Sequence, residues 1–155
     1  MSQAKKVFTR MCLNNWGGID HKVLEFHEYV NLFSGKSGSG KSTVMDAIQV
    51  ILYGSFSPSF LNKAADDAKN RRSVLSYLRG EQKDGSANRK DCDFCSVIAL
   101  EIEDTGTHII TCIGIAFEVR KSDSEIKKFV YFSHSGKMPT SGYLTEQGVK
   151  SAIIN

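Results

Sequence analysis

The segment Gly35-Lys36-Ser37-Gly38-Ser39-Gly40-Lys41-Ser42 constrains this chain more than any other feature, because it fits the phosphate-binding pattern G-x-x-x-x-G-K-[ST] at every fixed position. Glycine suits this pattern because the backbone must turn through conformations that a Cβ disfavours and bring its N–H groups against phosphate oxygens. Lys41 is expected to reach the β- and γ-phosphates of a nucleotide, and the Ser42 hydroxyl to ligate Mg²⁺. The sequence therefore predicts nucleotide binding.

The neighbouring residues support this interpretation, because a P-loop must join a buried strand to a helix. Residues 29–34 are largely apolar and rich in strand formers, which predicts a short strand. Residues 43–53 have helical apolar spacing, and Gly54 is a natural helix end. The alternative, a Gly/Ser-rich turn that happens to contain a lysine, is disfavoured by this context. The predicted nucleotide contacts are Gly35, Lys36, Ser37, Gly38, Ser39, Gly40, Lys41, Ser42 and Thr43.

Length and composition indicate an ordinary globular protein. The 155 residues are 41% hydrophobic and 24% charged, which predicts a single domain over residues 1–155. A formal net charge of +3 permits a nucleic-acid partner without arguing for one. There is no long apolar run and no signal-peptide pattern at the start, so we expect a cytoplasmic protein with no membrane partner.

The four cysteines include one C-x-x-C pair, Cys92 and Cys95. A zinc site would need a second pair or histidines at ligand spacing, and a thioredoxin-type site would need the pair to open a helix. Cys95 instead begins an alternating, strand-like run. Reduced, structural cysteines are favoured over metal or redox use.

The remaining segments indicate an antiparallel sheet. Strand-like residues 7–13 and 19–26 flank a turn at 14–18, which predicts a hairpin before the P-loop strand. Three further strands at 95–103, 108–120 and 127–133 predict a β-meander. Residues 61–72 and 73–79 fit short helices, and the hydrophilic run 80–91 fits a mobile surface loop. This order differs from the βαβ alternation of a small kinase or GTPase.

Residues 37–48 carry a resemblance to a known family. They match the pattern N-G-S-G-K-S-x-x-x-D-A-I of SMC-like, ABC-type ATPase heads at every fixed position except the first, where Ser37 replaces asparagine. Residues 76–80 and 92–101 resemble the branch that holds MukB-like heads and the JetC subunit of Wadjet plasmid-defence systems. The similarity spans most of residues 7–133.

The resemblance implies an α/β (α+β) P-loop NTPase fold, in which an ABC-type head lobe has a mixed sheet around the P-loop and an antiparallel β-subdomain. In this family two heads sandwich ATP and Mg²⁺, and long coiled coils connect the heads to activity on DNA in chromosome organisation or in plasmid or phage defence. A homodimer of heads is thus expected. Arg79 would correspond to the arginine that some SMC heads place near the phosphates, although an exposed loop arginine is an equally simple interpretation.

The hydrolytic motifs of that family are missing here. No run of four apolar residues is followed by Asp-Glu, and Ser141-Gly142-Tyr143 lacks the second glycine of the signature loop. The chain is therefore expected to be the N-terminal half of a head, with no catalytic residue of its own and with the C-terminal half-head of the same protein as its partner. Gln82 and Gln147 are candidates for the Q-loop glutamine, with a solvated glutamine favoured for each.

Other functions remain open. A self-contained P-loop kinase or transferase would need an acid to activate its substrate, for which Asp46 is a candidate, although a structural or Mg²⁺-shell role suits Asp46 better. A non-catalytic interaction module would use the β-meander as its surface. Basic residues at 69–72 and 89–90 are candidates for DNA phosphate contacts, but a mixed solvated surface is favoured. Trp16 is a candidate for stacking on adenine, but a core position is favoured.

Overall fold

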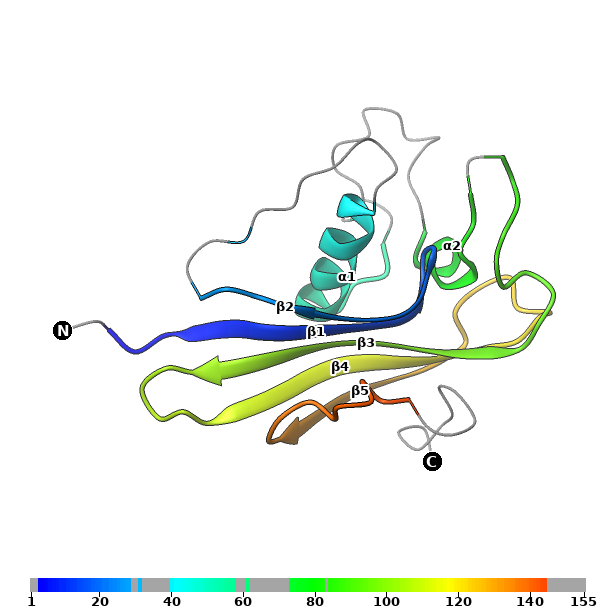
Figure 1. The fold of residues 1–155 in the computed structure, drawn as a ribbon. Helices are drawn as coiled ribbons and strands as arrows, with labels where there is room; N and C mark the ends of the chain where they lie inside the picture. Colours follow the sequence, from blue (N-terminus) through cyan, green and yellow to red (C-terminus); the bar gives the residue numbers. More distant parts are fainter. Residues whose placement is uncertain are drawn as a thin grey trace.

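The computed structural model describes residues 3–28, 31, 40–57, 61, 73–82 and 84–144. Within this part, five strands form one antiparallel sheet in the order β2-β1-β3-β4-β5 (Figure 1). The strands are β1 (Lys6–Trp16), β2 (Ile19–Glu25), β3 (Phe94–Asp104), β4 (Ile110–Val119) and β5 (Lys128–Ser135). The helices α1 (Lys41–Tyr53) and α2 (Val74–Arg79) share one hydrophobic cluster with one face of the sheet. No described helix has the length and apolar character needed to span a membrane.

The predicted hairpin and meander are both confirmed. Strands β1 and β2 pair antiparallel, and β3, β4 and β5 follow one another as antiparallel neighbours. The predicted turn at 14–18 is too long, because Asn14 and Trp16 still pair with β2, opposite His21 and Ile19. Only Gly17 and Gly18 connect the two strands, and Gly17 adopts a positive φ of 58° that favours glycine.

The hairpin and the meander form a single sheet because β1 pairs with β3, for example Leu13 opposite Ile98. Every strand pair in the described part of the chain is antiparallel, so the mixed sheet expected around the P-loop is not seen there. The segment predicted to supply the P-loop strand, residues 29–34, lies outside the described residues except for Asn31, which belongs to no strand.

The helix predicted after the P-loop is confirmed as α1. It ends at Tyr53, and Gly54 follows in the left-handed conformation (φ 61°), with its N–H donating to the Val50 carbonyl at 3.0 Å. Its buried apolar positions, Val44, Ala47, Val50 and Ile51, lie in the cluster that covers the sheet.

The second short helix is also confirmed, as α2. The Ser73 hydroxyl caps its start by accepting from the Ser76 N–H at 3.1 Å, and Gly80 ends it with a φ of 67°. The helix predicted at 61–72 lies outside the described residues apart from Leu61.

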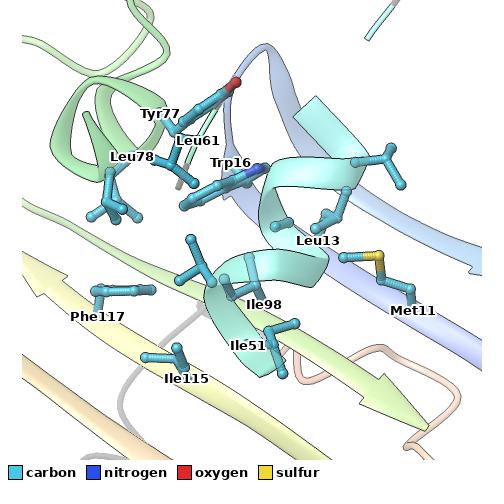
Figure 2. Packing of buried hydrophobic residues seen from close by; sticks show 14 of the residues in the cluster. Met11, Leu13, Trp16, Ile51, Leu61, Tyr77, Leu78, Ile98, Ile115 and Phe117 are labelled. Atoms are coloured by element: carbon cyan, nitrogen blue, oxygen red, sulfur yellow. The ribbon is translucent and has the colours of Figure 1, made fainter. Parts of the chain in front are cut away.

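The core between the helices and the sheet is built around Trp16 (Figure 2). Strict alternation along β1 would put Trp16 on the same face as Cys12 and Asn14. Asn15, however, has a left-handed backbone (φ 53°), and beyond it the indole joins the cluster of Met11 on the helix side. Trp16 has no exposed surface, so its core position is confirmed and stacking on adenine is excluded.

The opposite face of the sheet is covered by residues 136–144. Glu101, in β3, accepts hydrogen bonds from the Met138 N–H at 2.6 Å and from the Thr9 hydroxyl at 2.8 Å. Arg10 pairs with the Glu101 carboxylate at 2.6 Å and donates to the Met138 carbonyl at 2.9 Å. Nearby, the Gly142 carbonyl accepts from the Asn14 amide at 2.7 Å. Buried polar groups thus hold this segment on the sheet.

Replacing Glu101 with glutamine is expected to lower the free energy of unfolding at neutral pH by about 1–3 kcal/mol. Burial acts to raise the pKa of Glu101, but hydrogen bonds from Arg10, Met138 and Thr9 outweigh it, so the net pKa lies below its usual value of 4.5. A lowered folded-state pKa contributes stability above pH 4.5, which is lost as the pH falls through the folded-state value.

Urea unfolding of wild type and Glu101→Gln at pH 7 and under acid conditions checks this, because the difference between them should shrink below about pH 4.5. Glu81→Gln, which changes an exposed carboxylate, should keep wild-type stability at pH 7. A difference that stays constant across the acid range would show that the Glu101 charge is not the cause.

Candidate nucleotide-binding site

The end of the predicted P-loop lies at the start of α1. Gly40 precedes the helix with a φ of 93°, a conformation that favours glycine, and Lys41 and Ser42 form the first turn. Lys41 is half-buried and Ser42 is exposed. The first N–H groups of a helix point away from its body and favour an anion at its N-terminus, so this end of α1 suits a phosphate group.

The structure describes four of the nine P-loop residues predicted from the sequence. Gly40, Lys41, Ser42 and Thr43 are placed together, whereas Gly35, Lys36, Ser37, Gly38 and Ser39 lie outside the described residues. The exposed hydroxyl of Ser42, beside a lysine and a helix N-terminus, is the kind of oxygen ligand that Mg²⁺ takes alongside nucleotide phosphates. These four described residues are therefore suited to binding a nucleotide together with Mg²⁺.

Thr43 faces the protein. It is buried, and its carbonyl accepts the indole N–H of Trp16 at 2.9 Å. The Trp16 ring stacks on Tyr77 of α2, with 4.8 Å between the ring centroids and 9° between the planes. In this arrangement Thr43 links the first turn of α1 to the core.

Asp46 lies one turn beyond Ser42 and is 3% exposed. Its Oδ2 accepts a hydrogen bond from the Tyr77 hydroxyl. A carboxylate buried against a phenol cannot readily reach the hydroxyl of a small substrate, which argues against Asp46 as a kinase acid. The hydrogen bond from Tyr77 therefore supports a structural role for Asp46, as the sequence suggested.

Arg79 ends α2, and its guanidinium turns toward the loop after β4. Nη2 donates to the Asp123 carbonyl and lies 3.4 Å from the carbonyls of Arg120 and Lys121. These contacts give Arg79 a role in joining α2 to that loop. Its predicted contact with phosphates stays a prediction, since most of the P-loop is outside the described residues.

Arg89 has a structural role that the sequence did not reveal. It was a candidate for DNA contact in a loop expected to be mobile, but its side chain is buried. It donates to the Leu78 carbonyl at 2.7 Å and to the Gly17 carbonyl at 2.6 Å, and pairs with Asp20 at 3.2 Å. Desolvation by burial lowers the pKa of Arg89. Arg89 therefore anchors the 80–91 loop to the hairpin tip, and it is not available for DNA.

The other candidates are placed as follows. Gln82 is exposed and its side chain lies 3.3 Å from the Gly80 carbonyl, while Gln147 and the basic residues 69–72 lie outside the described residues. None of the four cysteines is joined in a disulfide, and burial raises the pKa of Cys12 to about 12. In the described ranges, no three His, Cys, Asp or Glu side chains group as metal ligands.

Comparison with known proteins agrees with a P-loop in this position. Residues 8–68 match the family described as the P-loop containing region of AAA domain, which spans β1, β2 and α1. The chain is also 39% identical over 74 residues to the SbcC component of the nuclease SbcCD from Staphylococcus haemolyticus (strain JCSC1435). That similarity covers 45% of this chain and 6% of the relative. The family match supports a P-loop in this segment of the chain.

Proposed function

We propose that this chain is the ATP-binding N-terminal segment of an SMC-like ATPase. The observation that carries the proposal is the start of α1, where Gly40 has a positive φ that favours glycine and Lys41 and Ser42 follow in the first turn. The match of residues 8–68 to a P-loop region also supports it.

The described residues would act by binding and orienting the nucleotide. Lys41 would neutralise charge on the β- and γ-phosphates, and the N-terminus of α1 would add its positive dipole at the same place. Ser42 would hold Mg²⁺, which when bound neutralises phosphate charge during phosphoryl transfer. Arg79 is proposed as a further phosphate contact in the assembled head.

Hydrolysis is proposed to need a C-terminal half-head, since the sequence contains no Asp-Glu pair that would end a Walker B strand. Co-purifying the chain with a C-terminal half-head that carries those motifs should give ATP turnover well above the sum of the separate halves. The same pair with Lys41→Ala is the control and should show no such gain. A mixture no faster than its two parts would count against the proposal.

The proposal extends to the assembly and the role of the full-length protein. A homodimer of heads, cytoplasmic and acting on DNA through the full-length protein, is consistent with the similarity to a component of a nuclease. Residues 76–80 and 92–101 favour the MukB-like or JetC branch, and with it chromosome organisation or plasmid defence. ATP-dependent retention of DNA by the full-length protein is the measurement that tests this role.

A self-contained kinase or transferase is the second candidate, and the structure weakens it. Its proposed acid, Asp46, is buried and bonded to Tyr77. Transfer of phosphate from ATP to a small metabolite by the isolated chain would favour the kinase or transferase function. A non-catalytic interaction module would be favoured if no nucleotide bound even with the complementary half present.

A further inference from the structure

The first two turns of α1 are tied to two other elements by buried hydrogen bonds. Asp46 accepts from the Tyr77 hydroxyl of α2, and the Thr43 carbonyl accepts from the indole of Trp16, at the end of β1. A buried carboxylate is costly unless it is bonded, so the Asp46–Tyr77 contact fixes the distance between α1 and α2.

Tyr77 is also held from its other sides. Its ring stacks on Trp16, and its carbonyl accepts the Gly17 N–H at 2.7 Å. Arg89 donates to the Gly17 carbonyl and to the carbonyl of Leu78. The hydroxyl of Tyr77 therefore projects from a rigid junction of α2 with the hairpin tip. Figure 2 shows Tyr77 beside Trp16 in this junction.

We propose that Tyr77 is a positioning residue for the nucleotide site, a proposal that rests on the proposed function of that site. Lys41 and Ser42 belong to the turn that Thr43 and Asp46 anchor, and a helix transmits a shift of one turn to the next because its backbone bonds are continuous. Groups that bind or orient phosphates lose effect when displaced by about 1 Å. Tyr77 thus sets where Lys41 and Ser42 meet the phosphates without touching the nucleotide.

The test replaces Tyr77 with phenylalanine, which keeps the ring on Trp16 and removes only the hydroxyl. The first measurement is amide hydrogen exchange in the nucleotide-free chain, where exchange at residues 44–46, whose amides are the first to bond within α1, should become faster while the end of α1 stays unchanged. The second is Mg·ATP affinity by calorimetry, which should weaken by about tenfold.

The matched control is Tyr143→Phe. Tyr143 lies with the cluster on the opposite face of the sheet, and its hydroxyl bonds His134 at 2.7 Å, so this variant also deletes one partly buried phenol hydrogen bond. It should leave both exchange at 44–46 and ATP affinity as in wild type. Asp46→Asn, whose amide oxygen can still accept from Tyr77, should keep affinity close to wild type, whereas Asp46→Ala, which removes the acceptor itself, should weaken affinity at least as much as Tyr77→Phe.

Each result decides one point. If the wild-type chain binds no Mg·ATP with its complementary half, the proposed function fails, while the exchange measurement still tests whether Tyr77 fixes the first turns. Unchanged exchange in Tyr77→Phe would overturn the positioning role. Faster exchange with unchanged ATP affinity, or an equal loss of affinity in Tyr143→Phe, would overturn it as well.

Discussion

Replacing Lys41 with alanine is expected to weaken the affinity of the chain for Mg·ATP by about 100-fold or more. Lys41 lies in the first turn of α1, and in a P-loop the ammonium group at this position is the point charge directed at the β- and γ-phosphates. Charge-assisted hydrogen bonds contribute roughly 1.5–3 kcal/mol each, and every 1.4 kcal/mol corresponds to about tenfold in affinity. Calorimetric titration with Mg·ATP measures the loss directly.

The control for this variant is Lys90→Ala, which removes an exposed lysine from the 80–91 loop. It should bind Mg·ATP as wild type does. The Lys41→Ala chain should unfold at the wild-type urea concentration, because alanine is a strong helix former. Equal affinities for wild type and Lys41→Ala would contradict the assignment of the site.

Replacing Trp16 with alanine is expected to lower the free energy of unfolding by about 3–5 kcal/mol, the usual loss for a large buried aromatic side chain. The indole is fully buried, stacks on Tyr77 and donates to the Thr43 carbonyl, so the variant leaves a cavity and removes this hydrogen bond together. Urea unfolding followed by circular dichroism is the suitable measurement, since the chain has one tryptophan and the variant has none.

Two comparison variants separate the contribution of the indole N–H from that of burying an aromatic ring. Trp16→Phe keeps an aromatic ring but removes the N–H donor, so it should lose less stability than the alanine variant. Tyr53→Ala changes an aromatic side chain that is 70% exposed on the same helix as Thr43, and should change stability by no more than about 0.5 kcal/mol. A loss below about 1 kcal/mol for Trp16→Ala would show that the indole is not the centre of this core.

The elements that the sequence predicted correctly are those with a local signal. The hairpin and the meander show alternating apolar residues between turn formers, and α1 shows apolar residues at helical spacing before Gly54. The pairing of β1 with β3 joins positions that are far apart in the sequence, as in Leu13 opposite Ile98, and no local pattern specifies it. Long-range contacts of this kind decide the topology of the sheet.

In the candidate site, too, the residues of a local motif were predictable and those with distant partners were not. Lys41 and Ser42 are recognisable because a P-loop needs fixed residue types at fixed spacing. The partner of Asp46 is 31 positions away, and Arg89 is buried within the most hydrophilic run of the chain. From the sequence, Arg89 looks like a solvated arginine. Its partners are mainly backbone carbonyls, which residues of every type provide, so no particular residue type marks them. The supports of the site therefore became visible only in the structure.

The most direct test of nucleotide binding through the phosphates is a calorimetric comparison of ATP, ADP and adenosine, with Mg²⁺, on the wild-type chain with its complementary half-head. A site built from Gly40, Lys41, Ser42 and the N-terminus of α1 recognises phosphate oxygens, so affinity should fall from ATP to ADP and be lost with adenosine. Adenosine binding as tightly as ATP, or no binding of any of the three, would contradict the account.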